Sequence, residues 1–186
     1  MSGSKIKPAN PMTPAIFVER ARTFLPLLSG HFRRQWPAWA LAGVAFHFFQ
    51  ANYGIGYNST PSLPFKLFLI HYNEPVNNGD YIVFHWHGGE PYPDGYLFTK
   101  RVVGTAGDTV LRRGREFRVN GQQFHANEYG ITGRELYPVD LPEGESIIPE
   151  QRYWVAGTHT FSLDSRYGLL GLVKQQDFVG RAYPIF

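Results

Sequence analysis

The segment 96–103 places a lysine where an amine could act as a base. The segment alternates as a β-strand does, so Lys100 shares one face with Phe98 and Val102. Burial among apolar side chains disfavours the charged form of a lysine and lowers its pKa. The pattern therefore predicts a half-buried amine that can accept a proton near neutral pH. An amine that reaches solvent from a sheet edge is the alternative.

A candidate partner for this base is Ser62. It lies between Pro61 and Pro64, which do not continue a helix and which fix the local backbone. A serine hydroxyl becomes an effective nucleophile when a neighbouring base takes its proton, and Ser–Lys pairs are one form of this arrangement. The two residues predict nucleophilic catalysis by Ser62 with Lys100 as the general base. An ordinary turn serine is the alternative.

The elements that must position these residues read as short strands. The chain has 186 residues, of which 43% are hydrophobic, with 20 Gly and 14 Pro. Short aromatic and β-branched runs between Gly, Pro, Asn and Asp are typical of a mainly β domain. Asn120-Gly121 predicts a hairpin turn, and 127–150 a long loop or small subdomain. The expected strands are 65–71, 80–87, 109–111, 116–119 and 153–156.

Charge and cysteine content exclude several classes of site. Six basic residues and one acidic residue precede Trp36, a net charge of +5, whereas 12 basic and 14 acidic residues follow, a net charge of −2. The basic excess thus lies in the N-terminal arm, which disfavours a nucleic-acid-binding domain. Without cysteine, the chain has no disulfide, thiolate nucleophile or zinc-thiolate site.

The stretch 36–53 predicts a transmembrane anchor. Its eighteen residues carry no formal charge, and as a helix they would extend roughly 27 Å, close to the thickness of a bilayer core. Basic residues precede the stretch and aromatic residues stand at both ends. We expect a basic cytoplasmic tail at 1–35 and an exported domain at 54–186. His47 and Gln50 are costly in lipid, so a buried N-terminal helix is the alternative.

Four separated segments follow the order of the signature segments of bacterial type I signal peptidases, so the chain resembles a member of that clan. The resemblance implies a fold of coiled antiparallel sheets, with the active site at the end nearest the membrane. The segments are 59–64 around the serine, 79–84 at an expected strand, 100–108 beginning at the lysine, and 162–168 (Ser-Leu-Asp-Ser-Arg-Tyr-Gly).

Within the clan, the chain most resembles conjugative-transfer signal peptidases of the TraF type. Their nucleophile follows an Asn-x-Thr-x-Ser pattern and precedes an aliphatic residue and proline, as in 58–64 (Asn-Ser-Thr-Pro-Ser-Leu-Pro). Ordinary leader peptidases usually have methionine after the serine. The resemblance implies a peptidase that matures the pilin precursor of a conjugative apparatus. Some relatives also join the pilin ends into a circle.

The resemblance also implies a role for each matching residue. Ser62 would form an acyl-enzyme, with Lys100 moving the protons. The Ser62 backbone N–H and the Thr60 hydroxyl would hold the oxyanion. Ser162 would orient Lys100. The pair Asp164 and Arg166 would support the site from behind, although a buried ion pair often only fixes a loop.

The resemblance further implies a location and partners. The enzyme would lie in the bacterial inner membrane, in contact with the lipid bilayer and with its catalytic domain in the periplasm. It would act on a pilin precursor or another membrane-bound preprotein, with small side chains beside the cut. It would use no cofactor, metal or nucleic acid.

Other side chains suggest weaker alternatives. His85 and His87 lie two apart on an expected strand and could share a metal ion. His159 stands three residues before Ser162 and suggests a Ser–His pair. Arginines at 112, 113, 115 and 118 could contact anionic headgroups, although a solvated hairpin is the ordinary interpretation.

Three functions therefore compete. The first is pilin maturation by a membrane-anchored Ser–Lys peptidase, and the second is a general leader peptidase for secreted proteins. The third is a non-enzymatic component of the transfer apparatus, for which Ser62→Ala would be silent. A self-cleaving repressor with the same pair would need a DNA-binding module, and none is visible before Ser62.

Overall fold

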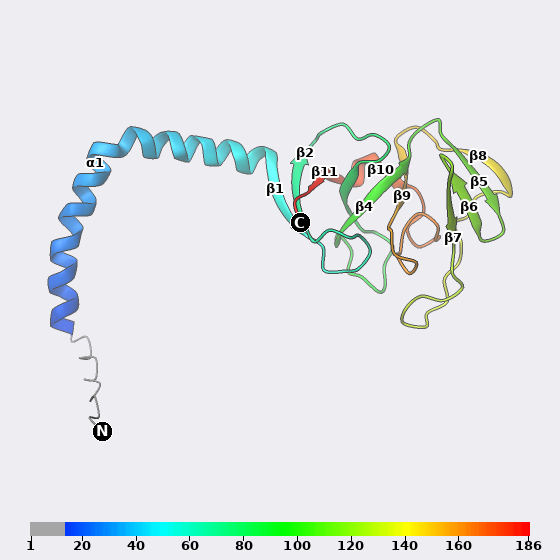
Figure 1. Cartoon of the computed structure of the whole chain (residues 1–186), viewed down its shortest axis with the longest axis horizontal. Helices are drawn as coiled ribbons and strands as arrows, with labels where there is room; N and C mark the ends of the chain where they lie inside the picture. Colours follow the sequence, from blue (N-terminus) through cyan, green and yellow to red (C-terminus); the bar gives the residue numbers. More distant parts are fainter. Residues whose placement is uncertain (1–13) are drawn as a thin grey trace, which may run out of the picture. The chain divides into compact units, whose positions relative to one another are not determined.

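The computed structural model describes the backbone of residues 14–186 and the side chains of Arg22 and residues 30–186. The chain divides into two compact units, Met1–Ala51 and Asn52–Phe186. The first contains nearly all of a single helix, α1 (Pro14–Asn52) (Figure 1). All of the strands that the structure describes lie in the second unit. Of the tail expected at 1–35, residues 1–13 lie outside the described residues. The remainder, from Pro14, is helical.

The transmembrane anchor expected at 36–53 is not supported by the structure. The segment is helical as far as Asn52. Among residues 14–186, however, no helix offers a stretch long and apolar enough to cross a bilayer. The physical reason lies in the composition of the segment, where His47 and Gln50 are polar and several other positions are Ala, Gly, Pro or Trp rather than strongly apolar residues.

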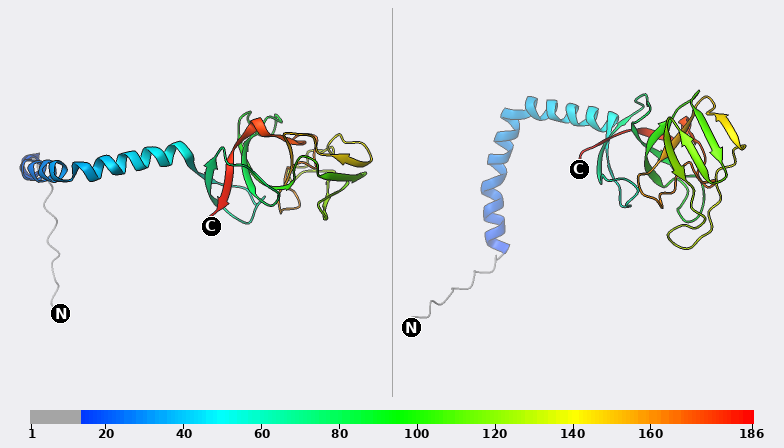
Figure 2. Two further views of the ribbon diagram at one scale, coloured as in Figure 1. Left: turned by 90° about the horizontal axis from the view of Figure 1, so that it is seen from above. Right: turned by 45° about the vertical axis from the view of Figure 1, so that its right-hand side comes forward.

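The larger sheet of the second unit is antiparallel and has seven strands in the order β1-β2-β11-β3-β4-β9-β10. β11 lies between β2 and β3 and is red in Figure 2. The strands are β1 (Tyr53–Tyr57), β2 (Leu67–Tyr72), β3 (Tyr81–His85), β4 (Leu97–Gly104), β9 (Arg152–Ala156), β10 (Val173–Lys174) and β11 (Phe178–Pro184), with a short 3-10 helix, η1 (Gln175–Asp177), before β11.

A smaller antiparallel sheet has the order β7-β6-β5-β8. Its strands are β5 (Thr109–Arg113), β6 (Glu116–Val119), β7 (Gln122–His125) and β8 (Gly144–Ile147). Asn120 and Gly121 form the β6–β7 turn with positive φ of 47° and 77°, as a tight hairpin of this kind requires. The prediction of a mainly β fold with antiparallel sheets is confirmed. β8 was not predicted, and it lies inside the segment expected to be a long loop or small subdomain.

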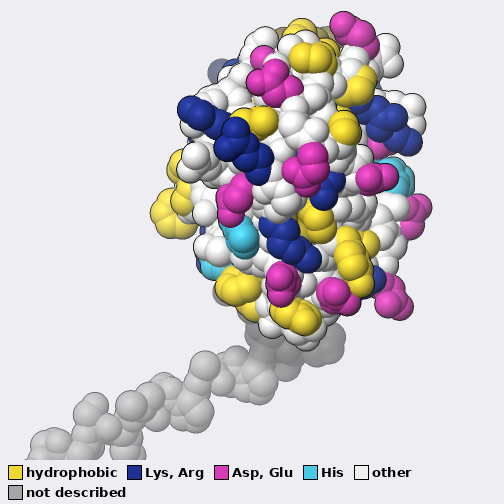
Figure 3. All heavy atoms as spheres, turned by 90° about the vertical axis from the view of Figure 1, so that its right-hand side faces the viewer, with side chains coloured by type: hydrophobic (Ala, Val, Ile, Leu, Met, Phe, Trp, Pro, Cys, Tyr) yellow, Lys and Arg dark blue, Asp and Glu magenta, His cyan; other side chains and the backbone are white. Residues whose placement is uncertain are grey.

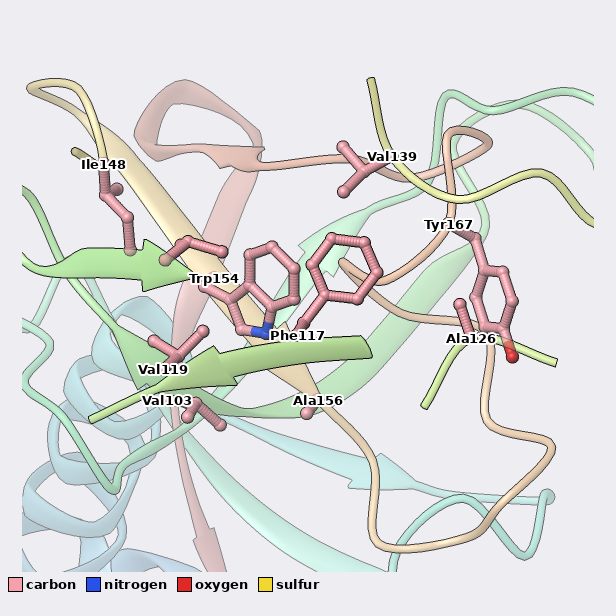
Figure 4. Close-up of a cluster of buried hydrophobic side chains, with 10 residues drawn as sticks. Val103, Phe117, Val119, Ala126, Val139, Ile148, Trp154, Ala156 and Tyr167 are labelled. Carbon is pink, nitrogen blue, oxygen red and sulfur yellow. The ribbon is translucent and has the colours of Figure 1, made fainter. Parts of the chain in front are cut away.

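Three apolar clusters form the core of the second unit. One joins the two sheets, with Trp154 of β9 packed against Phe117 of β6 at a ring-centroid distance of 5.2 Å (Figure 4). A second includes Phe84, Trp86 and Phe98 beside the middle of β4. The third surrounds Leu63 and the start of β2. Leu63, directly after Ser62, thus enters one cluster, and Phe98 and Val102, two residues to either side of Lys100, enter another, which fixes both segments.

Two arginines of the β5–β6 hairpin, Arg112 and Arg115, bind the backbone of the segment between β7 and β8 through hydrogen bonds. Arg112 donates to the backbone carbonyls of Val139 and Leu141. Arg115 donates to three carbonyls, those of Ala126, Asn127 and Leu136, at 3.1–3.3 Å. The face shown in Figure 3 carries basic and acidic side chains next to one another. The structural role of these two arginines explains their position without an anionic ligand.

Candidate active site

Ser62 lies in the turn segment between β1 and β2. It is 7% exposed, and the next residue, Leu63, is buried against Phe68 and Val83. The Ser62 carbonyl accepts a hydrogen bond of 2.9 Å from the Thr158 N–H. The apolar anchor at Leu63 and the backbone bond from Thr158 together fix the serine in place.

Lys100 lies in the middle of β4, opposite Ile82 of β3. Phe98, Lys100 and Val102 are all buried, so the predicted face of the strand is confirmed. Lys100 is 4% exposed and is therefore more deeply buried than the sequence predicted. Its Nζ donates a hydrogen bond of 2.9 Å to Ser162 Oγ and lies 5.5 Å from the centroid of the Phe98 ring.

This environment changes the protonation of the lysine. Burial lowers the pKa of Lys100 from 10.5 to about 8. The Asp164 carboxylate opposes this shift, whereas the Arg166 guanidinium adds to it. A pKa of about 8 leaves an appreciable fraction of neutral amine at neutral pH, and that form can accept a proton.

Thr60 connects the serine to the preceding residues of the turn. Its Oγ1 lies 2.8 Å from Ser62 Oγ and 2.9 Å from Asn58 Oδ1. The hydroxyl of Thr60 therefore stands directly beside the nucleophile candidate, where an oxyanion donor would be needed.

Asp164 and Arg166 form a buried ion pair behind Ser162. Asp164 is 0% and Arg166 5% exposed, and the two side chains meet in a fork with Nε–Oδ1 and Nη2–Oδ2 distances of 2.8 and 2.9 Å. Arg166 also donates to the carbonyl of Ser162, and the Gly157 N–H donates to Asp164. The pair therefore holds the two backbone segments that flank the Ser162 hydroxyl.

Gly157 lies where these segments come closest together. A Cβ at this position would lie 2.7 Å from the Ser62 carbonyl oxygen and still closer to Ser162 Oγ. Real Cβ atoms do not approach other heavy atoms so closely. Only glycine lets the segment after β9 pack against both serines.

A cleft of about 250 Å³ opens at these polar groups. Thr60, Ser62, Lys100 and Ser162 all line it, so the structure brings these four predicted residues together. Asp164 and Arg166 are absent from the lining, and Arg166 is hydrogen-bonded to the carbonyl of Ser162. Most of the remaining wall is apolar, formed by Tyr92, Tyr96, Phe98, Ile131, Phe161 and Leu163.

The histidines have other partners. His159 lines the cleft, but its Nδ1 accepts a hydrogen bond of 3.2 Å from the Phe161 N–H. His87 contacts Asp94 at 2.7 Å and Asp177 at 3.8 Å, and its ring centroid is 6.4 Å from that of His85. Among the side chains that the structure describes, no group of three or more His, Cys, Asp or Glu residues could hold a metal ion.

Sequence reasoning missed the contributions of Asn58 and Gly157. Asn58 stood inside the recognised motif, yet its hydrogen bond to Thr60 depends on the turn geometry. Nothing in the sequence distinguished Gly157 from the other 19 glycines. The importance of Asn58 depends on the conformation of its own turn, and that of Gly157 on the close approach of the segment after β9 to both serines.

Comparisons with known proteins agree on one family. A family model described as signal peptidase, peptidase S26, matches residues 29–186. The chain is 30% identical over 123 residues to signal peptidase I P of Bacillus subtilis subsp. natto, with 63% of each chain covered. It is 33% identical over 120 residues to signal peptidase I of Leptolyngbya laminosa, with 62% of this chain and 55% of that relative covered. The chain thus matches less than two thirds of the length of these curated relatives.

One solved structure is also similar to part of this chain. The crystal structure of a signal peptidase I from Enterococcus faecalis V583 is 26% identical, with a TM-score of 0.34. The match covers 57% of this chain and 96% of that one. Because the family model extends over most of the sequence, including all the residues of the cleft, the chain belongs to the signal peptidase family, peptidase S26, which is a family of serine peptidases.

Proposed function

We propose that this chain is a serine endopeptidase in which Ser62 is the nucleophile and Lys100 the general base. The observation that carries the proposal is the buried amine of Lys100, whose pKa is about 8, in the same cleft as Ser62. A neutral lysine can take the proton of a serine hydroxyl, as in other Ser–Lys pairs.

The reaction proceeds through an acyl-enzyme. Ser62 Oγ attacks the scissile carbonyl carbon while its proton passes to the neutral Lys100 amine. The resulting oxyanion accepts hydrogen bonds from the Ser62 N–H and from the Thr60 hydroxyl. When the C–N bond breaks, Lys100 returns the proton to the leaving amine. Lys100 then takes a proton from water as the water oxygen attacks the ester, and it gives this proton to Ser62 Oγ when the acyl C–O bond breaks.

Ser162 and the ion pair serve the geometry of this reaction. The Ser162 hydroxyl accepts from Lys100 Nζ and so aims the amine. Asp164 and Arg166 hold the backbone around Ser162. Their role is to keep Lys100 in place, because neither side chain lines the cleft.

An unpaired strand edge beside the cleft suits a peptide substrate. β9 pairs with β4 only from Arg101 onwards, although β4 begins at Leu97. Within residues 14–186, residues 97–100 therefore leave one edge of β4 without a strand partner and also line the cleft. An extended substrate segment can add to such an edge through backbone hydrogen bonds.

We place the catalytic unit at the periplasmic face of the bacterial inner membrane. One face of β1, β2 and β11 supports this. On adjacent strands, Leu69 of β2 pairs with Ile55 of β1 and with Tyr183 of β11. Ile55 and Tyr183 are exposed, as are the nearby Tyr57 and Ile185. An exposed apolar surface of this kind suits contact with lipid or with a membrane-bound preprotein.

We propose that the substrate is the pilin precursor of a conjugative transfer system. The segment 58–64 supports this, since its Asn-x-Thr-x-Ser-Leu-Pro pattern resembles the conjugative branch of the clan. If the pilin's own amine replaces water in the second step, the product is circular. General processing of secreted proteins is the second candidate, favoured by relatives that are named signal peptidase I.

Intact-mass spectrometry of the pilin from cells with and without this chain tests the substrate. We expect the precursor to keep its full mass without the chain, and to be shortened when the chain is supplied. A product lighter by one water than the linear peptide indicates cyclisation. Pilin that is shortened in both strains contradicts pilin processing. Accumulation of many secreted precursors supports the general peptidase.

The rate of cleavage should depend on pH through Lys100. The base must be neutral, and the protonated form of Lys100 dominates below its pKa of about 8. We expect kcat/KM to rise roughly tenfold per pH unit below that value and to level off above it. A pH profile with an internally quenched peptide measures this. A rate that does not change between about pH 6 and about pH 8 is incompatible with Lys100 as the base.

A further inference from the structure

Asn58 is a buried polar residue. The hydrogen bonds of its side chain go to other residues of the turn that carries Ser62. It is 8% exposed and lies four residues before Ser62. Its Oδ1 accepts from the Thr60 hydroxyl at 2.9 Å and from the Thr60 N–H at 3.2 Å. Its Nδ2 donates to the carbonyl of Phe65 at 3.2 Å. The amide therefore ties the start of the turn to its end.

These contacts fix the direction of the hydroxyl hydrogen bonds. The Nδ2 group of Asn58 points at a carbonyl, so the atom that faces Thr60 is the acceptor Oδ1. A threonine hydroxyl has one proton, and Thr60 donates it to Asn58. In the 2.8 Å contact between Thr60 and Ser62, the serine is therefore the donor.

We propose that Asn58 is a positioning residue that sets the hydrogen-bond direction Ser62 to Thr60 to Asn58 in the resting enzyme. The inference rests on the proposed roles of Ser62 and Thr60. In this state the Ser62 proton points toward Thr60 Oγ1, and the Lys100 amine donates a hydrogen bond to Ser162 Oγ. Asn58 thus holds the Thr60 hydroxyl beside the nucleophile before substrate arrives.

The neutral charge of Asn58 matters for the reaction. When the oxyanion forms, the Thr60 proton turns from Asn58 Oδ1 toward the oxyanion, and the Ser62 proton passes to Lys100. Charged acceptors form stronger hydrogen bonds than neutral ones, so the oxyanion outcompetes the amide. A carboxylate at position 58 would instead retain the Thr60 proton. The structure therefore assigns Asn58 a role that an acidic residue of equal size does not fulfil.

A double-mutant cycle in the full chain tests this role. The variants are Asn58→Ala, Asn58→Asp, Thr60→Val, and each Asn58 change combined with Thr60→Val. Cleavage of an internally quenched peptide with alanine before the scissile bond gives kcat and KM. The pH is set above the Lys100 pKa of about 8, so that the base is neutral. Asn77→Ala is the matched control, because Asn77 is exposed and its side chain lies outside the cleft.

The expected result is a loss in kcat that depends on Thr60. Thr60→Val should lower kcat by roughly 10²-fold, as loss of an oxyanion donor does. Asn58→Ala should lower kcat by about tenfold and Asn58→Asp by more, with KM nearly unchanged. Neither Asn58 change should lower kcat further once Thr60 is valine. Asn77→Ala should leave kcat at the wild-type value.

The inference would be overturned if the fold-losses in kcat of the two single variants multiplied in the double variants. Asn58 would then act on the turn and not through the Thr60 hydroxyl. A change confined to KM or to the melting temperature would overturn it as well. The isosteric Asn58→Asp variant keeps the test valid if Asn58→Ala folds poorly. Ser62→Ala separates the two proposals: cleavage by that variant refutes the proposed function, whereas additive Asn58 effects in an otherwise Ser62-dependent enzyme refute only the role of Asn58.

Discussion

Ser62→Ala and Lys100→Met are each expected to lower kcat by at least about 10³-fold, because one removes the proposed nucleophile and the other the proposed base. Methionine has nearly the length of lysine and fits its apolar surroundings beside Phe98. It cannot accept a proton. Cleavage of the quenched peptide, followed by mass spectrometry of the products, measures both effects.

Lys174→Met is the matched control for the base. Lys174 lies on β10, is exposed, and is absent from the lining of the cleft. Its replacement should leave kcat unchanged. If Lys100→Met cleaves as fast as Lys174→Met, Lys100 is not the base. If Ser62→Ala processes preprotein like the wild type, a scaffold or a different nucleophile must replace the proposed mechanism.

Asp164→Asn is expected to lower the free energy of unfolding by about 3–5 kcal/mol. The substitution leaves the buried Arg166 guanidinium without its countercharge. In one orientation it also turns an amide NH₂ group toward the arginine. Chemical denaturation of wild type and variant measures the difference. Asp140→Asn, at an exposed position, is the control and should change stability little.

The same substitution has a predictable effect on the base. The Asp164 carboxylate raises the pKa of Lys100 against the larger effect of burial. Its removal leaves burial and the Arg166 charge, both of which lower that pKa. The midpoint of the pH–rate profile should therefore move to lower pH. A stability loss no larger than that of Asp140→Asn, or a midpoint that moves to higher pH, contradicts this account of the ion pair.

The sequence carried enough information to identify the cleft but not its closest packing. Alternation in β4 placed Lys100 on a buried face, because apolar periodicity directly reflects which side of a strand meets the core. Asn120-Gly121 identified a hairpin because few residue pairs tolerate two positive φ values. Such local rules depend only on neighbouring residues.

The features that the sequence did not predict correctly depend on partners that are distant in the chain, or on small differences in hydropathy. β8 is four residues long and becomes a strand through its pairing with β5, not through its own composition. The segment 36–53 lacks charge, which suggested a span, yet absence of charge is a weaker property than high mean hydropathy. The requirement for glycine at 157 arises only where Ser62 and Ser162 meet.

The position of β11 in the larger sheet determines when the two halves of that sheet can join. β11 joins β2, which follows the Ser62 turn, to β3, which leads to Lys100 on β4. Ser162 and the ion pair also come late in the sequence. During synthesis, the serine and the lysine thus emerge long before the strand that joins their two halves of the sheet. A nascent chain therefore cannot complete the larger sheet until residues 178–184 have been synthesised, so the segments that carry Ser62 and Lys100 are joined only at the end of synthesis.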